Sequence, residues 1–233
     1  MSIATIILAG GIGSRMESDL PKQFIEVCGK PIIIHTLENF IRNKRVDRIL
    51  VVCEEHWIDH LEQILRRFDI QDVDVISGGS TSHDSIRNGV FRLENELSDD
   101  DYVIVHDAAR PVIPQFIIDD LIDVASEHGN ACSTLPFYEP VMISDDGVSA
   151  LKEISRNNLK RTGAPQMFRY DILLDSYKKA EKDGLHDFVY ANLVVAHYGH
   201  EIYFSKGTAM NIKVTYPEDI ALLESILRIS EIH

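Results

Sequence analysis

The stretch "LAGGIGSRMESDLPKQF", residues 8–24, decides how this chain is interpreted, because it joins an apolar run to a loop of glycines and cations. Residues 3–8, which lead into it, have the length and apolar composition of a buried strand. Gly10, Gly11 and Gly13 then follow where this strand leaves its sheet. Ligands of open α/β sheets bind beyond the carboxyl ends of the strands. The stretch therefore predicts a ligand site directly after the first strand.

The rest of the chain repeats an alternation of strand-like and helix-like segments. Stretches with helical periodicity begin at residues 31, 56, 80 and 114. Further strand-like runs lie at residues 48–53, 72–77, 102–107 and 131–136. These runs are apolar throughout, as expected for strands covered on both faces. The pattern predicts an α/β fold with a mostly parallel, twisted sheet and helices on both faces.

The alternation stops after Pro136. Residues 137–163 hold a turn at 145–147 between two short strand-like pieces, which predicts an extended hairpin arm. Such an arm buries little of its own surface, so we expect it to pack on a partner subunit. A helix over 170–182, a strand over 201–205, a short strand over 210–214 and a helix after Pro217 are then expected.

Size and charge bound the function further. The 233 residues, 45% of them hydrophobic, suit a single domain over 1–233 with a full core. No apolar stretch reaches the roughly 18 residues of a membrane span, and no signal segment is apparent, so we expect a cytoplasmic protein without membrane partners. The net charge of −14 argues against binding nucleic acid. Three widely spaced cysteines, Cys28, Cys53 and Cys132, favour reduced thiols over disulfides or a zinc site.

The glycine loop is suited to binding a phosphate, because glycines let backbone N–H groups approach an anion closely. A purely structural strand-to-helix turn is the alternative, since the third glycine of a dinucleotide fingerprint and the Gly-Lys-Ser/Thr of a P-loop are both missing. Arg15 and Lys22 flank the loop, and Pro21 restricts the backbone before Lys22. Two cations on one glycine loop favour a polyphosphate.

The stretch "VHDAARP", residues 105–111, places Asp107 at the end of an apolar strand on the same edge of the sheet. An acid beside phosphate oxygens is well placed to hold Mg²⁺, and capping a helix or turn is the alternative. Two interpretations of Arg110 stay open, which are phosphate binding and an ion pair with Asp107. His106 is interpreted as a packing or orienting residue and not as a general base.

The stretch "MNIKVTYPED", residues 210–219, places Lys213 inside the short strand expected at 210–214. Burying an ammonium group without a counter-charge is costly, so a phosphate partner would explain this lysine. An edge-strand lysine is the alternative.

Five motifs together resemble a known family: "LAGGIGSRM…PKQF", "GGSTSHDSIRNG" (78–89), "VHDAARP", "APQMF" (164–168) and "NIKVTYPED", in this order. The chain is similar to the cytidylyltransferases of polyol phosphates, which act on 2-C-methyl-D-erythritol 4-phosphate or ribitol 5-phosphate. The resemblance implies a Rossmann-like nucleotidyltransferase fold and a homodimer with interlocked arms. It also implies a Mg²⁺-dependent reaction of CTP with a polyol or sugar phosphate, giving a CDP-polyol and pyrophosphate.

The resemblance also assigns roles to residues. Arg15, Lys22 and Lys213 correspond to the groups that stabilise the α-phosphorus, and Asp107 corresponds to the metal ligand. The positions that bind CTP are Ala9, Gly10, Gly11, Gly13, Gly78, Gly79, Ser85 and Asp107. Those that bind the acceptor are Arg156, which reaches across the dimer, Ala108 and Arg110.

Three departures from the family pattern bear on the acceptor. Ala164 stands where a threonine is usual, "YEPVM" (138–142) replaces an Asp-Thr pair, and "VYA" (189–191) replaces a Thr-Asp stretch. We expect all three on the acceptor side, which favours a ribitol-phosphate-like or other pentitol or sugar phosphate as acceptor. The alternatives are a 2-C-methyl-D-erythritol 4-phosphate cytidylyltransferase and a non-catalytic nucleotide-binding relative. A dinucleotide oxidoreductase is disfavoured, because the second strand ends at Cys53, too far from the glycine loop.

Overall fold

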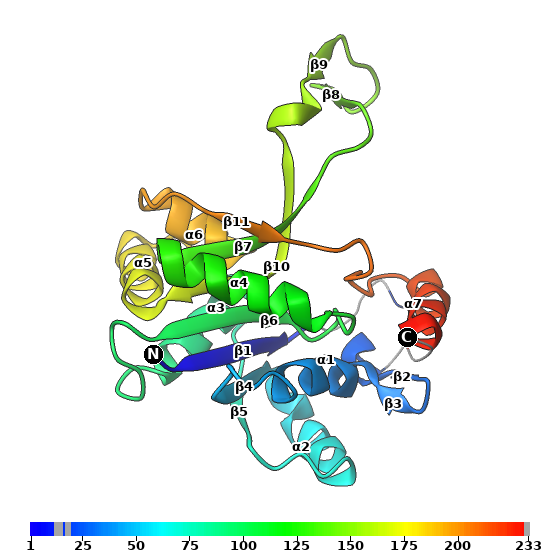
Figure 1. Ribbon diagram of the computed structural model, residues 1–233, viewed down its shortest axis with the longest axis vertical. Helices are drawn as coiled ribbons and strands as arrows, with labels where there is room; N and C mark the ends of the chain where they lie inside the picture. The colour runs from blue at the N-terminus through cyan, green and yellow to red at the C-terminus, as the bar shows by residue number, and fades with distance from the viewer. Residues whose placement is uncertain (12–15, 17–19, 231–233) are drawn as a thin grey trace.

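A central sheet of seven strands organises the chain in the computed structural model, which describes residues 1–11, 16 and 20–230 (Figure 1). The strand order is β11-β7-β10-β6-β1-β4-β5, and only β10 runs antiparallel to its neighbours. The strands are β1 (Ile3–Ala9), β4 (Arg48–Cys53), β5 (Val73–Ser77), β6 (Tyr102–Asp107), β7 (Asn130–Pro136), β10 (Lys160–Arg169) and β11 (Phe204–Lys206). The predicted α/β fold with a mostly parallel sheet is therefore confirmed.

Alternate side chains of β1 enter two separate cores, which explains why this strand is apolar throughout. Ile7 packs in the core on one face of the sheet and Ile6 in the core on the other. In the parallel register, Leu50 of β4 and Val105 of β6 lie on either side of Ile6. All three are at most 4% exposed, so the middle of the sheet is sealed from water on this face.

Helices cover both faces of the sheet (Figure 1). Helices α1 (Ile32–Ile41), α2 (Ile58–Arg67) and α4 (Gln115–His128) share one core, which includes Leu37, Leu61 and Leu121. Helices α3 (Ser82–Arg92), α5 (Tyr170–Asp183) and α6 (Ala191–His197) share the other, which includes Val90, Tyr177 and Val194. The C-terminal α7 (Glu218–Ser230) and the small hairpin of β2 (Glu26–Val27) and β3 (Lys30–Pro31) meet in a third cluster.

A hairpin projects from the body of the molecule between β7 and β10 (Figure 1). Its two short strands, β8 (Val141–Ile143) and β9 (Lys152–Ile154), pair in antiparallel register. Leu151 is fully exposed and Val148 is 91% exposed at its tip. We call residues 137–159 the arm. The rest of the same chain therefore does not cover these apolar side chains, and they are exposed to solvent.

Two features differ from the sequence expectations. Residues 210–214 form no strand: Val214 donates its N–H to the carbonyl of Ala109, outside any sheet ladder. The antiparallel β10 was not predicted, because Gly163 and Pro165 interrupt its apolar pattern. Its inner half is nevertheless buried between β6 and β7.

None of the described helices is long and apolar enough to cross a bilayer. The three cysteines are free thiols, as expected, with Cys53 and Cys132 buried and Cys28 exposed.

Helix α3 lies close to the sheet because Gly89 faces it. A Cβ atom at Gly89 would come within 3.0 Å of two side-chain carbons of Ile6 and 3.2 Å of a methyl carbon of Val52. We expect Gly89→Val to lower the free energy of unfolding by about 1–3 kcal/mol through overpacking, measured by urea denaturation. Lys182→Val places valine at an exposed position of α5 and is the control. Equal stability of the two variants would contradict this view of the α3 packing.

Candidate active site

The N-terminus of α3 forms one wall of the site. Ser85 ties the loop after β5 to this helix. Its Oγ accepts a hydrogen bond from the Gly79 N–H at 3.1 Å and donates to the Thr81 carbonyl at 2.9 Å. A Cβ atom at Gly79 would lie 2.2 Å from Cβ of Asp84, so a side chain has no room there. Cβ atoms at Gly10 and Gly78 would lie 3.5 and 3.0 Å from Ser85 Oγ. The loops after β1 and β5 therefore meet on this one serine.

A cavity of 340 Å³ opens between this wall and the carboxyl ends of β1 and β6. We call it the first cavity. The predicted site residues on its lining are Gly10, Gly11, Lys22, Gly79, Ser85, Asp107, Ala108 and Lys213. The structure thus brings together residues that lie more than 200 positions apart in the chain.

Other predicted residues lie elsewhere. The Ala9 side chain packs in the core, and its carbonyl accepts a hydrogen bond from Gln23 Nε2 at 2.7 Å. Gly78 contacts Ser85 and is not part of the lining. Gly13 and Arg15 lie outside the described residues.

Lys22 is held close to the glycine loop. It begins the short 3₁₀ helix Lys22–Phe24, and the Gln23 bond to Ala9 ties this helix to the end of β1. The Lys22 Cε lies 3.9 Å from the position of a Cβ at Gly11, and the residue is only 8% exposed. Its cation is thereby positioned where the glycine backbone faces the cavity.

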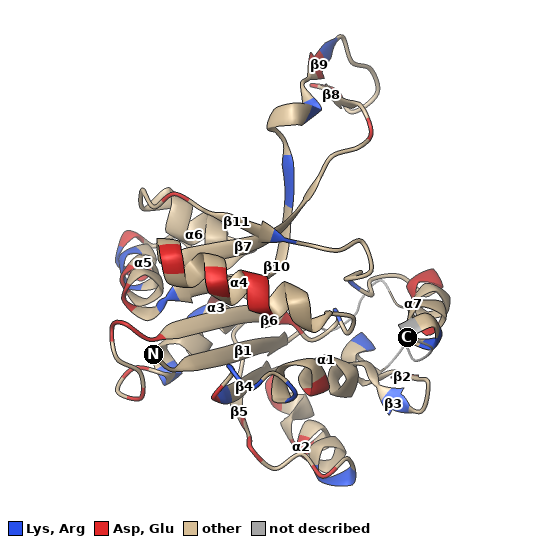
Figure 2. Ribbon diagram, in the orientation of Figure 1, with Lys and Arg blue, Asp and Glu red and all other residues tan. Residues whose placement is uncertain are grey.

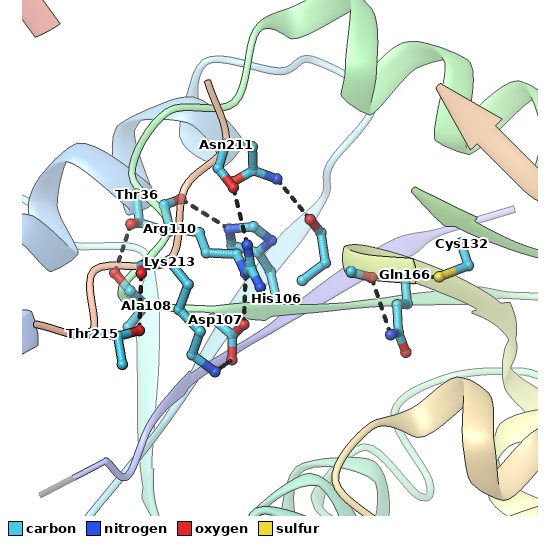
Figure 3. Close-up of polar contacts among 12 residues, drawn as sticks. Thr36, His106, Asp107, Ala108, Arg110, Cys132, Gln166, Asn211, Lys213 and Thr215 are labelled. Atoms are coloured by element: carbon cyan, nitrogen blue, oxygen red, sulfur yellow. Dashed lines mark hydrogen bonds and ion pairs between the residues drawn. The ribbon is translucent and has the colours of Figure 1, made fainter. Parts of the chain in front are cut away.

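Asp107 lies between two cations (Figure 3). Its Oδ1 is 2.9 Å from Lys213 Nζ and its Oδ2 is 2.9 Å from Arg110 Nε. Burial alone would raise the pKa of this carboxyl, but the charges of Lys213 and Arg110 outweigh it and lower the pKa to about 2. Asp107 is therefore an anion at neutral pH, and its side chain pairs with these cations instead of capping a helix.

Hydrogen bonds hold the loop after Asp107 in place. Arg110 donates from its guanidinium to the Asn211 carbonyl at 3.0 Å, and the Ala108 carbonyl accepts from Thr36 Oγ1 at 2.8 Å (Figure 3). His106 Nε2 lies 3.0 Å from the Arg110 carbonyl, within hydrogen-bond distance. Of the two interpretations of Arg110, the ion pair with Asp107 is the one present in this structure.

His106 is fully buried and packs against the ring of Phe40, 5.2 Å away between ring centroids. Burial lowers the pKa of its imidazole to about 4, so the ring is neutral at pH 7. Because it lies under the loop and outside the lining of the first cavity, it is placed to hold the loop and not to exchange protons with a ligand.

Lys213 reaches Asp107 from an irregular segment, so the expected strand around it is wrong and so is the edge-strand alternative. The Asn211 carbonyl holds Arg110, the Val214 N–H holds Ala109, and Thr215 Oγ1 donates to the Lys213 carbonyl at 2.9 Å. These contacts anchor the segment alongside the loop after β6. The lysine is therefore held by its ion pair and by backbone bonds.

A second cavity of 310 Å³ adjoins the first, and Lys213 lines both. Its lining includes three cations, Arg110, Arg161 and Lys213, and no carboxylate among the described residues. Ala164 also lines it, and the carbonyl of Ala164 accepts from Asn211 Nδ2 at 2.7 Å. The pair of cavities can hold two anionic ligands side by side, with Lys213 at their junction.

The three departures from the family pattern do not share one location. Ala164 lines the second cavity, Tyr138 lies in the arm, and Val189 lines the first cavity. Val189 and Ala164 thus line different cavities, and the expectation that all three departures lie on the acceptor side stays a prediction. Arg156 lies in the arm, where its guanidinium donates to the Tyr138 carbonyl, and it lines neither cavity.

Sequence reasoning missed Asn211 and Arg161. Asn211 is a buried polar residue beside the apolar part of "MNIKV", a pattern that could have indicated a structural hydrogen bond. Arg161 precedes "TGAPQ" in a strand that was not predicted, so nothing in its local sequence connected it with the second cavity.

Known proteins match this chain over nearly its whole length. The family model of 2-C-methyl-D-erythritol 4-phosphate cytidylyltransferase (IspD) matches residues 3–229. A ribitol-5-phosphate cytidylyltransferase of Lacticaseibacillus paracasei is 40% identical, covering 99% of this chain and 100% of its own. A protein of the same name from Vibrio parahaemolyticus is 38% identical, covering 99% and 98%. A 2-C-methyl-D-erythritol 4-phosphate cytidylyltransferase of Clostridium novyi is 36% identical, covering 95% of each chain.

Solved structures share the fold of this chain. The 2-C-methyl-D-erythritol 4-phosphate cytidylyltransferase of Francisella tularensis has a TM-score of 0.82 at 26% identity, covering 97% of this chain and 100% of its own. The 4-diphosphocytidyl-2C-methyl-D-erythritol synthase of Anaerococcus prevotii shares the fold, with a TM-score of 0.82 at 23% identity, covering 97% and 96%. On these matches, the chain belongs to the 2-C-methyl-D-erythritol 4-phosphate cytidylyltransferase family.

Proposed function

We propose that this protein transfers the cytidylyl group of CTP to the phosphate of a five-carbon polyol, ribitol 5-phosphate or a close analogue, and releases pyrophosphate. The observation that carries the proposal is the junction of two adjacent cavities at Lys213, beside the Asp107 carboxylate. A nucleotide in the first cavity and a phosphate in the second would meet there. Family membership and the names of the relatives support CTP as the nucleotide.

In the first cavity, the triphosphate would lie on the backbone of Gly10 and Gly11, between the cations of Lys22 and Lys213. Arg15, which lies outside the described residues, is proposed to add a third cation. The base would lie toward Gly79 and Ser85 at the N-terminus of α3. This placement directs the α-phosphorus toward Lys213 and the second cavity.

The reaction needs no covalent enzyme intermediate. An oxygen of the acceptor phosphate forms a bond to the α-phosphorus while the bond to the β-phosphate oxygen breaks, and pyrophosphate leaves with that electron pair. A phosphate monoester has a second pKa near 6, so it is a competent nucleophile without a general base. Lys22 and Lys213 would neutralise the charge that builds up on the phosphoryl oxygens. This accounts for an active site in which the histidine next to Asp107, His106, is buried and neutral.

The donor set at Asp107 fits a magnesium ion that arrives with the nucleotide. Among the described residues, no group of three or more His, Cys, Asp or Glu side chains could enclose a metal by itself. Mg²⁺ is commonly held by one or two carboxylates together with substrate phosphates. A carboxylate offers about four lone-pair sites, so Asp107 could bind the ion while it also accepts from Lys213 and Arg110. When bound, the ion would neutralise triphosphate charge as a Lewis acid.

We further propose a homodimer in which the arm of one subunit completes the site of the other. Two observations support it. The arm exposes Tyr138, Met142, Val148 and Leu151, which a partner would cover. Arg156 lines neither cavity of its own chain. If Arg156 reached the second cavity of a partner subunit, it would add a cation there for the acceptor phosphate.

The experiment that tests the function is pyrophosphate release with CTP and Mg²⁺ against a panel of polyol and sugar phosphates. We expect ribitol 5-phosphate to give the highest kcat/KM, because the two relatives with 40% and 38% identity carry that substrate in their names. Higher kcat/KM with 2-C-methyl-D-erythritol 4-phosphate would assign the chain to the alternative acceptor. CTP binding without turnover of any acceptor would support a non-catalytic relative.

Asp107→Asn tests the carboxylate. The change keeps the size of the side chain but leaves Lys213 and Arg110 without their counter-charge and removes a charged metal ligand. We expect kcat/KM to fall by about 100-fold or more, measured by pyrophosphate release at saturating Mg²⁺. Asp175→Asn breaks an ion pair with Lys179 on α5, neither residue lines either cavity, and this variant is the matched control. Near wild-type activity of Asp107→Asn would remove this residue from the mechanism.

Mixing two inactive variants tests whether Arg156 acts across the dimer. In a mixture of Arg156→Ala and Asp107→Asn, each heterodimer would hold one intact site if the arginine comes from the partner. Random exchange of an isologous dimer then restores about a quarter of wild-type activity, measured as pyrophosphate release. If Arg156 served its own subunit, no site would be intact and the mixture would stay inactive.

A further inference from the structure

One cation of the second cavity has no partner among the described residues. Arg110 and Lys213 both form ion pairs with Asp107. Arg161 of β10, which lines the same cavity, has no ion pair or side-chain hydrogen bond to any described residue. Figure 2 shows the basic segment of β10 where the strand leads into the arm. In a chain of net charge −14, a guanidinium on a cavity wall that pairs with no described residue indicates a ligand with electron-rich oxygens.

Arg161 lies at the outer end of this cavity. Ala164 marks the inner end, because its carbonyl binds Asn211, whose own carbonyl holds Arg110. Arg161 precedes Ala164 by three positions along β10, on the side of the strand that leads into the arm. On β7, its partner in the sheet is Leu135. The cavity therefore runs from the Lys213 junction toward the base of the arm.

Two of the four hydroxyl-bearing residues on the wall, Ser133 and Thr134, donate their hydrogens within the chain and favour donors on the ligand. Ser133 Oγ donates its hydrogen to the Lys206 carbonyl at 3.0 Å, and Thr134 Oγ1 donates to the Ser205 carbonyl at 3.3 Å. A hydroxyl has one hydrogen, so both oxygens keep only acceptor capacity toward a ligand. A chain of ligand hydroxyls supplies the missing donors, and its oxygens accept in turn from Arg161.

We propose that Arg161 is a specificity-determining residue that binds the hydroxyl end of the acceptor, opposite the phosphate that attacks CTP. This inference rests on the proposed function, because that reaction places the acceptor phosphate at the Lys213 junction. The acceptor chain then extends away from the nucleotide toward Arg161. A five-carbon polyol phosphate reaches the arginine, and a three-carbon one falls short of it.

The test compares Arg161→Gln with Lys160→Gln. Lys160 is the adjacent cation, is exposed as Arg161 is, lies outside the lining, and loses the same charge in its variant. We measure kcat/KM for ribitol 5-phosphate and glycerol 3-phosphate with saturating CTP and Mg²⁺. If glycerol 3-phosphate gives no turnover, its inhibition constant against ribitol 5-phosphate replaces kcat/KM. Calorimetric titration with ribitol 5-phosphate measures binding without turnover.

For Arg161→Gln, we expect the KM and the Kd for ribitol 5-phosphate to rise about tenfold or more, as for loss of a hydrogen bond from a charged donor. The KM for CTP and the value for glycerol 3-phosphate should stay within about twofold of wild type, and Lys160→Gln should change none of these values. Arg161→Lys should recover part of the loss, because it restores the positive charge.

Three results would overturn the inference: an unchanged KM for ribitol 5-phosphate in Arg161→Gln, equal losses for both acceptors, or an equal loss in Lys160→Gln. If the wild type released no pyrophosphate with any acceptor, the proposed function would fail, and the titration would still decide about Arg161. Weaker binding of ribitol 5-phosphate by Arg161→Gln would then support its role. Equal binding, or no binding by either protein, would reject it.

Discussion

The ion-pair cluster around Asp107 is the interaction on which the site depends. A buried carboxylate is tolerated only when it is paired, and here both oxygens are engaged, one by Lys213 and one by Arg110. The acid ends β6, the arginine lies on the loop that follows, and the lysine comes from the segment before α7. One carboxylate thus fixes three parts of the chain at the carboxyl edge of the sheet. Both cavities open beside it because Lys213 faces each of them.

This arrangement explains how a chain with a net charge of −14 can offer a site to two phosphates. Asp107 holds two cations in place before any ligand arrives, so little rearrangement is needed when phosphate oxygens approach. Thr36 and the neutral, buried His106 hold the loop after β6 through its carbonyl groups. Ser85 contacts the glycine loops of the first cavity and holds them together. The polar network beneath the cavities is therefore what positions the charges above them.

The sequence predicted β1, β4 and β6 because each is a continuous apolar run, and it placed Lys22 and Asp107 at one edge because the ends of parallel strands meet there. Lys213 was assigned to the same site by the family resemblance. It failed where tertiary pairing outweighs local pattern. Strand β10 contains Gly163 and Pro165, so only its burial between β6 and β7 identifies it. The segment around Lys213 has apolar neighbours, yet an ion pair and a backbone bond to Ala109 hold it, and no strand forms. Arg161 belongs to the site only through the three-dimensional course of β10.

The ionisation of Asp107 is the property to measure, because two cations must outweigh burial to keep this carboxyl charged. A ¹³C NMR titration of the aspartate carboxyl carbons, with Asp107→Asn to assign the resonance, follows this group alone. We expect a pKa of about 2, so that the Asp107 carboxyl stays ionised as the pH falls through the ordinary value of 3.8. Because this pKa is lowered in the folded protein, its contribution to stability is complete above pH 3.8 and is lost as the pH falls toward 2. A titration midpoint at or above 3.8 in the folded protein would show that Lys213 and Arg110 do not outweigh the burial of Asp107.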